Sequence, residues 1–592
     1  MISYLHFFAI SVICANIISF FVLNVMRLNT SFILPVYCIS LIISYLLLPK
    51  TMLLQSIKKY IKISLSRREF KIVSVIFSSI FLLLILSRIH YFLEPFTMKL
   101  APFICEGEGY LGLILSSIVN SDIFPIKIVT NNELLLSYYY APYLLPAALY
   151  QAFSFSWITV KSVGFLAYVI LTFICLLGSF SLPLLFFNNK KSYFLFLLLF
   201  MGTASGGDIL LWIKKLFEGI VFNHAGHWGF YFGYMGGYAD TLKQMGWSFH
   251  HPIAIVALFY AYFLFKRECN DTPNWKNKII ISLLLAASFF SSFYVTAGAI
   301  PFGIWLTIAH WRKKKNIILK IYLISFLMVL PNLWLYFGRY SCHRKLLPDM
   351  NVYGGFMFPF FYYPEIVLQS EFFGHLSTIF MKVGWDFVPQ FLRAALNTVG
   401  LNYLIVILFF LGLMAFSFFY CIPFLIYFFK EKIKDKSILV PFFIAIGVLL
   451  VPFVVIMDGQ NDLSVKGAAV AVIVFYAILA KYSAPILNKS SSMKTVCIVL
   501  LLISFIGIIN VMGSLNKTTV IYIKDYVQGK QSTPDELKTL RISQDRTIKV
   551  LDYNDYKSMN IFYLFKKITN VPIEDNAHIK FLSRRPVGSV ND

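Results

Sequence analysis

The chain has 592 residues, of which 58% are hydrophobic and only 14% are charged, and its mean hydropathy is +0.73. Because water-soluble domains carry about a quarter charged residues, this composition excludes an ordinary cytosolic protein, and the high hydrophobicity excludes disorder. The formal net charge of +24 would point to a nucleic-acid partner in a soluble chain. The eight cysteines are scattered without a Cys-x-x-Cys pair, so neither a disulfide framework nor a cysteine metal site is expected.

Apolar stretches of the length that crosses a bilayer, about 20 residues, recur along the whole sequence. The first stretch lacks the basic start and the small-residue cleavage site of a signal peptide, so we interpret it as a retained span. We predict an all-α polytopic integral membrane protein with about 13 transmembrane helices. The predicted spans are 2–24, 31–48, 72–88, 160–187, 193–205, 250–266, 279–294, 296–311, 317–337, 402–429, 438–456, 467–482 and 495–514.

Lysine and arginine gather in alternate loops, and such basic loops stay on the cytoplasmic side. The largest groups lie in loop 49–71 and in the run Arg312–Lys315. With these spans, one side collects 24 basic and 5 acidic residues, whereas the opposite loops hold 13 basic and 14 acidic residues. We therefore predict a cytoplasmic N-terminus and an outside C-terminus, in a bacterial inner (plasma) membrane. The excess charge indicates topology, so no nucleic-acid partner is predicted.

The spans divide the chain into three parts. Residues 1–71 hold two N-terminal helices and a basic cytoplasmic loop, and residues 72–514 form the multispan core. The tail 515–592 is rich in Lys, Asp, Thr and Ser, and its alternating run Thr547–Leu551 indicates a strand, so we predict a small α/β appendage outside. The three long outside loops of the core are 89–159, 206–249 and 338–401.

Two carboxylates stand in a glycine-flanked turn of the first outside loop, as Glu106-Gly-Glu108-Gly. At this spacing Glu106 and Glu108 can converge above the membrane, where they could accept a proton from a hydroxyl or hold a divalent cation. The alternative is a loop at headgroup level that simply needs polar residues. An aromatic stretch with Tyr139 and Tyr140 follows in the same loop and is typical of a helix lying in the interface.

The next two outside loops carry a histidine pair and a basic cluster. His250 and His251 stand at the mouth of a span, where polar residues are costly and tend to be functional, although a plain interfacial pair is the alternative. Arg339, Arg344 and Lys345 oppose the positive-inside trend, which favours a phosphate partner. Anionic lipid headgroups are the competing explanation.

A short outside turn late in the chain holds Asn461, Asp462 and Lys466 between two predicted spans. Lys466 begins the following helix, where a positive charge opposes the helix dipole. This cost indicates an anionic partner nearby.

The order of these features resembles the GT-C superfamily of membrane glycosyltransferases, which take a sugar from a polyisoprenyl-phosphate carrier on the outer face. The resemblance is carried by the Glu106–Glu108 turn, the segment Asn120–Pro125, the aromatic stretch Tyr139–Tyr143 and the segment Asn461–Gly467. The chain departs from the family by placing the acidic loop after its third span and by using Glu in place of Asp. Which carboxylate acts as the base therefore stays open.

The resemblance implies an inverting transfer of a hexose or pentose to a glycan, lipid or protein acceptor of the cell envelope. Glu106 or Glu108 would be the general base, and membrane lipids would surround the carrier. No cofactor is certain, and a divalent cation, Mg²⁺ or Mn²⁺, is compatible with the site but not required. The residues expected to bind the substrate or its phosphate are Arg339, Arg344, Lys345, Lys466, Asp462, Asn461, His250, His251, Tyr139 and Tyr140.

Two other classes fit the same composition. An envelope polysaccharide polymerase or ligase shares lipid-linked substrates but needs no acidic first loop. A lipid-linked glycan transporter or flippase predicts internal repeats and charged residues at the membrane midplane. Lys161 and Lys320 lie near span ends, and the central positions of the predicted spans are otherwise nearly free of charge, which disfavours an ion-coupled transporter.

Overall fold

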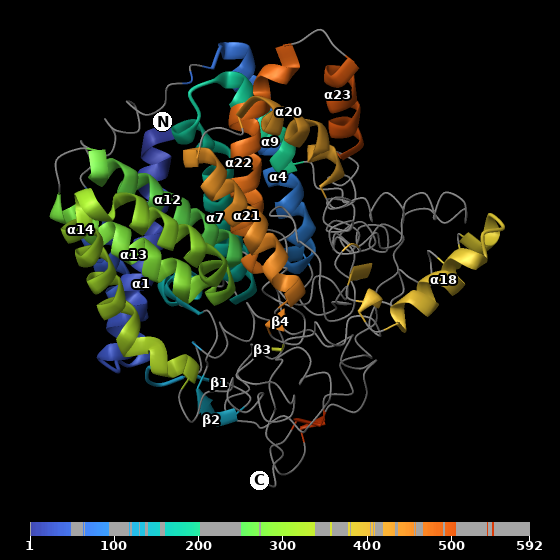
Figure 1. The fold of residues 1–592 in the computed structure, drawn as a ribbon. Helices are drawn as coiled ribbons and strands as arrows, with labels where there is room; N and C mark the ends of the chain where they lie inside the picture. The colour runs from blue at the N-terminus through green and yellow to red at the C-terminus, as the bar shows by residue number, and fades with distance from the viewer. Residues whose placement is uncertain are drawn as a thin grey trace.

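In the computed structural model the described part of the chain is a bundle of helices with three short pairs of strands (Figure 1). Five of the described helices are long and apolar enough to cross a membrane, which indicates an integral membrane protein. The structure describes residues 2–48, 63, 65–93, 118, 121–128, 131–135, 140–153, 160–201, 250–270, 274–337, 356–357, 377–378, 380–398, 400–402, 404–405, 408, 418–432, 436–454, 456–457, 466–488, 492–504, 541–542 and 548–549.

The elements follow the chain in an order close to the predicted spans. The first part contains α1 (Ile2–Val25), η1 (Thr30–Phe32), α2 (Ile33–Leu47), α4 (Arg67–Leu93), β1 (Lys127–Ile128), β2 (Asn131–Leu135), η2 (Ala141–Tyr143), α6 (Leu144–Ala152), α7 (Val160–Ser181), α8 (Pro183–Phe186) and α9 (Lys190–Met201). The second contains α12 (His250–Asn270), α13 (Trp275–Ser291), α14 (Phe293–Phe337), β3 (Phe356–Met357), α18 (Phe387–Leu396), η6 (Phe419–Cys421), α20 (Ile422–Lys432), α21 (Lys436–Val454), β4 (Ile456–Met457), α22 (Ala469–Ser483), η8 (Ala484–Asn488), α23 (Ser492–Ser504), β5 (Arg541–Ile542) and β6 (Ile548–Lys549).

Helix α1 is enclosed by other helices. Of its apolar window 72% is buried, against 17% for α4 and 22% for α14. It contacts α2, α7, α12, α13 and α14. His6 Nδ1 lies 2.6 Å from the Tyr260 hydroxyl, which joins α1 to α12 in the interior. Because an unpaired polar group in an apolar interior is costly, this bond fixes which faces of the two helices meet.

Helix α14 folds back on itself at Lys314, whose backbone leaves the helical region with φ −135° and ψ 24°. The hydroxyls of Thr307 and Tyr322 are hydrogen-bonded across this turn. In a straight helix these residues would be about 22 Å apart. The two halves are therefore antiparallel helices, and they agree in position with the predicted spans 296–311 and 317–337 and with the basic turn between them. Ile308 is 71% exposed, as expected for a helix that faces lipid.

Several predicted span boundaries are shifted. Residues 160–187 form two helices, since α7 ends at Ser181 and Pro183 begins α8, a position that proline favours. Helix α20 continues to Lys432, beyond the predicted end at 429. Helix α23 begins at Ser492, before the predicted start at 495. Parts of the predicted spans 193–205, 402–429 and 495–514 lie outside the described residues.

The strands form three antiparallel pairs, β1 with β2, β3 with β4 and β5 with β6. In the second pair Phe356 lies opposite Met457, so the third outside loop is attached to the segment that leads to Lys466. Strand β6 lies within the predicted strand 547–551, which is confirmed for Ile548 and Lys549. The α/β tail as a whole stays a prediction, because these two strands are all that the structure describes of it.

Contacts between helix ends define two ends of the bundle. At the first, Lys190 Nζ lies 2.8 Å from Glu69 Oε2, and Lys278 Nζ lies 3.0 Å from Glu268 Oε1. The Phe186 and Tyr262 rings, 5.5 Å apart, join these two groups of helices. We call this the basic end.

The opposite end of the bundle holds the C-terminus of α1 and the starts of α12 and α22. In Figure 1 strands β1 to β4 lie below the helices, away from the N-terminus.

Candidate functional site

Five buried polar side chains lie together at the end of the bundle opposite the basic end. The side chains of Tyr143, His250, His251 and Ser292 are fully buried, and Lys466 is 4% exposed. We call these five residues the His–Lys cluster. Because ionisable groups in the interior of a membrane protein are expensive, they tend to serve a function. The cluster is the strongest candidate site among the residues that the structure describes.

A tyrosine-containing turn joins the cluster to α1. Pro142 lies in the first turn of η2, where its fixed φ suits helical backbone, and η2 continues directly into α6. The Tyr140 hydroxyl donates to Asn24 Oδ1 at 2.5 Å, at the end of α1. The Tyr143 hydroxyl lies 3.2 Å from His250 Nδ1, at the start of α12. One turn of chain thus fixes two helix ends relative to each other.

The two histidines are the first residues of α12, and their ring centroids are 4.0 Å apart. His251 Nδ1 lies 2.8 Å from the Ser292 hydroxyl. Ser292 separates α13 from α14, and its Oγ also accepts a hydrogen bond of 3.3 Å from the backbone N–H of Val295. A neutral imidazole has one donor and one acceptor nitrogen, so each ring can donate to a ligand or take up a proton.

Lys466 brings a positive charge into the cluster from the segment before α22. Its Nζ lies 5.5 Å from the centre of the Tyr294 ring, which stabilises a cation through the ring's π face. The ammonium is also close enough to His250 to act on it electrostatically.

A contact between two glycines holds this segment in place. A Cβ built on Gly298 would lie 1.9 Å from the carbonyl oxygen of Gly467. Glycine is therefore required at position 298, because the backbone of α14 touches the backbone next to Lys466. This contact sets how far Lys466 reaches toward the start of α12.

The side chains of the cluster suit the recognition of an anion. An ammonium, two imidazoles and two hydroxyls supply several hydrogen-bond donors, and charge-assisted bonds to a phosphate are the strongest that such donors form. The positive charge of Lys466 and these donors are thus chemically matched to an anionic ligand.

The sequence predictions for the site have two outcomes. The structure brings His250 and His251 together with Lys466 in electrostatic range of His250, and Tyr140, three residues before Tyr143, has its hydroxyl bonded to Asn24. The remaining predicted site residues lie outside the described residues, namely Glu106, Glu108, Tyr139, Arg339, Arg344, Lys345, Asn461 and Asp462.

Metal binding by the carboxylate pair is likewise untested by the described residues. Within the described ranges, no group of three or more His, Cys, Asp or Glu side chains could hold a metal ion. Since Glu106 and Glu108 fall outside those ranges, the divalent cation stays a prediction.

Sequence patterns did not identify Tyr143, Ser292 or Asn24 as parts of this region. Tyr143 belongs to the aromatic stretch that was predicted to lie in the membrane interface, and this position was a weak indication of its place in the site. Ser292 lies inside the predicted span 279–294, and Asn24 closes the first apolar stretch. Nothing local in the sequence indicates that these three side chains meet the start of α12. Comparison of the chain with protein-family models, curated proteins and solved structures found no match.

Proposed function

We propose that this chain is a GT-C-like membrane glycosyltransferase that moves a sugar from a polyisoprenyl-phosphate carrier to a glycan, lipid or protein acceptor of the cell envelope. The observation that carries the proposal is the burial of Lys466 over the Tyr294 ring and within electrostatic range of His250, at the end of the bundle opposite the basic end. A buried cation among proton-carrying side chains suits a ligand with a phosphate group.

The proposed topology puts this cluster on the outer face. In it the chain crosses a bacterial plasma membrane about 13 times, and the basic end faces the cytoplasm because basic loops are retained there. The His–Lys cluster then lies at the level of the outer headgroups, where a carrier lipid holds its phosphate. The C-terminal tail would form a small α/β domain on the same side.

The proposed reaction is a displacement with inversion at the anomeric carbon. Glu106 or Glu108 takes the proton of the acceptor hydroxyl, and the hydroxyl oxygen forms the new bond to the anomeric carbon. The bond from that carbon to the phosphate oxygen breaks, and the phosphate leaves with the electron pair. The products are the glycosylated acceptor and polyisoprenyl phosphate, with the proton on the carboxylate.

In this proposal the cluster stabilises the leaving phosphate. Negative charge on the phosphate grows as the bond breaks, so a fixed ammonium at Lys466 favours the transition state over the ground state. His250 and His251 donate hydrogen bonds to phosphate oxygens, together with the basic cluster of Arg339, Arg344 and Lys345. Asn461, Asp462, Tyr139 and Tyr140 are assigned to the binding of the substrate or its phosphate.

The test is sugar transfer in membranes that contain the full chain. Radiolabelled polyisoprenyl-phosphate hexoses and pentoses are supplied, and the release of polyisoprenyl phosphate is measured together with label in the acceptor fraction. Loss of one transition-state donor costs about 10²- to 10³-fold in kcat, and we expect a loss of this size for Lys466→Met. Lys466→Arg keeps the charge and should retain part of the activity.

The matched control is Lys315→Met, which removes an exposed lysine at the basic end, where Lys315 lies over the Trp311 ring. This control should transfer sugar at the wild-type rate. Undiminished transfer by Lys466→Met would contradict the phosphate role, and undiminished transfer by the double variant Glu106→Gln, Glu108→Gln would contradict the role of both carboxylates. Absence of transfer from every donor would contradict the proposed function itself.

A further inference from the structure

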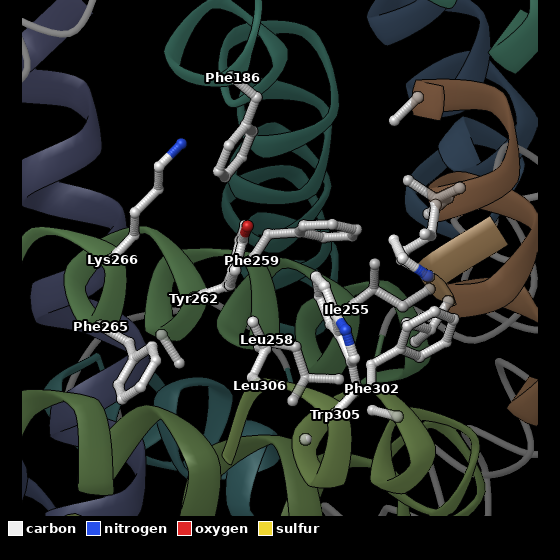
Figure 2. Close-up of a pocket in the computed structure, with 18 of the residues that line it drawn as sticks. Phe186, Ile255, Leu258, Phe259, Tyr262, Phe265, Lys266, Phe302, Trp305 and Leu306 are labelled. Carbon is white, nitrogen blue, oxygen red and sulfur yellow. The ribbon is translucent and has the colours of Figure 1, made fainter. Parts of the chain in front are cut away.

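A large cavity lies between α8, α12, α14, α21 and α22, beside the helices that carry the His–Lys cluster. Its volume is about 920 Å³, near the upper limit of ligand pockets, which span roughly 300–1,000 Å³. Figure 2 shows side chains of α12 on one wall, Phe186 on another, and Phe302, Trp305 and Leu306 of α14 on a third. The cavity is therefore lined by side chains from several helices.

The wall of the cavity is mainly aromatic and aliphatic. Phe186 stacks on Tyr262 with ring centroids 5.5 Å apart and meets Phe259 at 6.4 Å. Ile255, Leu258 and other aliphatic residues of α12, α14 and α22 complete it. Because polar molecules lose hydrogen bonds to water in such surroundings, this wall favours a hydrocarbon chain.

Among the described residues, the charged side chains that line the cavity are Lys266, near the end of α12, and Lys481, near the end of α22. Both side chains are exposed. Along α22, Lys481 lies roughly 22 Å from Lys466 at 1.5 Å per residue. His250 and Lys266 are separated in the same way along α12. Both cations thus belong to the basic end, far from the His–Lys cluster.

This combination fits an amphiphile with an anionic headgroup. We propose that the cavity binds an acidic phospholipid, whose phosphate contacts Lys266 and Lys481 and whose acyl chains lie along the aromatic wall. Basic pockets between membrane helices recognise acidic headgroups, and the leaflet next to the basic side of a membrane protein is rich in such lipids. The charge at the rim and the apolar depth are thus complementary to the two parts of one molecule.

The far part of the cavity reaches the neighbourhood of the His–Lys cluster. Thr296 lines it, and the Thr296 hydroxyl is bonded to Ser288 Oγ at 2.9 Å and to the Ser292 carbonyl oxygen at 3.1 Å. Val470, one turn beyond Lys466, also lines it. An acyl chain in the cavity would fill the space between α12 and α22, and so stabilise the helices whose other ends hold His250 and Lys466.

The test compares lipid binding by the purified full chain in nanodiscs. Discs of phosphatidylcholine alone are compared with discs that also contain phosphatidylglycerol, and bound lipid is measured by native mass spectrometry after release from the disc. A lysine near the headgroups contributes about 1 kcal/mol, or about fivefold in affinity, so we expect Lys266→Ala with Lys481→Ala to weaken phosphatidylglycerol binding about 25-fold. Replacement of both by Arg should keep the binding.

The matched control is Lys276→Ala with Lys315→Ala, two lysines of the same end that do not line the cavity. It should bind phosphatidylglycerol as the wild type does. Equal affinity in the cavity variant and this control would overturn the proposal, as would displacement of the lipid by soluble glycerol phosphate, which would indicate a free-phosphate site. Lys466→Met should bind phosphatidylglycerol with wild-type affinity although it slows sugar transfer. The lipid-binding measurement therefore tests this proposal independently of the proposed function.

Discussion

Lysine or histidine lies at or just before the start of α12 and α22 and again near the end of each, but these side chains are buried at one end of the bundle and exposed at the other. At one end Lys466 is 4% exposed beside His250. At the other, Lys266 and Lys481 are exposed at the rim of an apolar cavity. An exposed lysine indicates which side of a membrane a loop occupies, whereas a buried one needs a compensating partner. The environment of the charge, rather than its sign, thus separates a topology signal from a candidate site.

The basic end itself holds one buried and one exposed ion pair. The Lys278–Glu268 pair is nearly enclosed, with 12% and 0% of the two side chains exposed, whereas the Lys190–Glu69 pair has 42% and 30% exposed. Glu268 also accepts hydrogen bonds from the Asn277 side chain and the backbone N–H of Asn274, which ties the end of α12 to the start of α13. These two pairs allow burial to be tested with one chemical change.

The largest expected effect is that of Lys278→Met. The substitution leaves the buried Glu268 carboxylate with neutral partners, and breaking a buried pair in this way costs about 3–5 kcal/mol. We expect the free energy of unfolding to fall by about 3 kcal/mol, since the bonds from Asn277 and Asn274 remain. Reversible unfolding in sodium dodecyl sulfate, followed by circular dichroism, measures it. A fall below about 1 kcal/mol would mean that this pair behaves like a surface pair.

Gly298→Ala should have the next largest effect, at the opposite end of the bundle. The new methyl group would meet the Gly467 carbonyl oxygen, and such overpacking costs about 1–3 kcal/mol. Gly303→Ala is the control on the same helix, because a Cβ there meets no atom within 4 Å. We expect a lower thermal midpoint for the first variant and an unchanged or slightly higher one for the second. Equal midpoints would contradict the close backbone contact beside Lys466.

Lys190→Met should have the smallest effect. Exposed ion pairs contribute little to stability, because solvent screens them and both side chains lose freedom on pairing. We expect no resolvable change in the free energy of unfolding, measured in the same detergent titration as Lys278→Met. A loss as large as that of Lys278→Met would show that burial does not explain the difference between the two pairs.

The sequence predicted much of the helical architecture. Apolar length is a local property, so α1, α2, α12 and α21 follow their predicted spans closely. The basic run at Arg312–Lys315 predicted the turn within α14, since four charges cannot lie in the bilayer core at low cost. The break at Pro183 was missed, because one proline in a long apolar stretch leaves the hydropathy unchanged.

Three residues of the candidate site were also predicted from the sequence. His250, His251 and Lys466 stood out as polar residues at span ends, where such residues are costly. Membrane character, helix order and the alternation of basic loops can be read from the sequence alone, because each depends on residues close together in the chain. Helix packing, in contrast, brings Lys466 within electrostatic range of His250, puts Gly298 against Gly467, and lets Lys266 and Lys481 line one cavity. Each of these pairs joins segments far apart in the chain, so their meeting depends on how the helices pack and not on any local pattern.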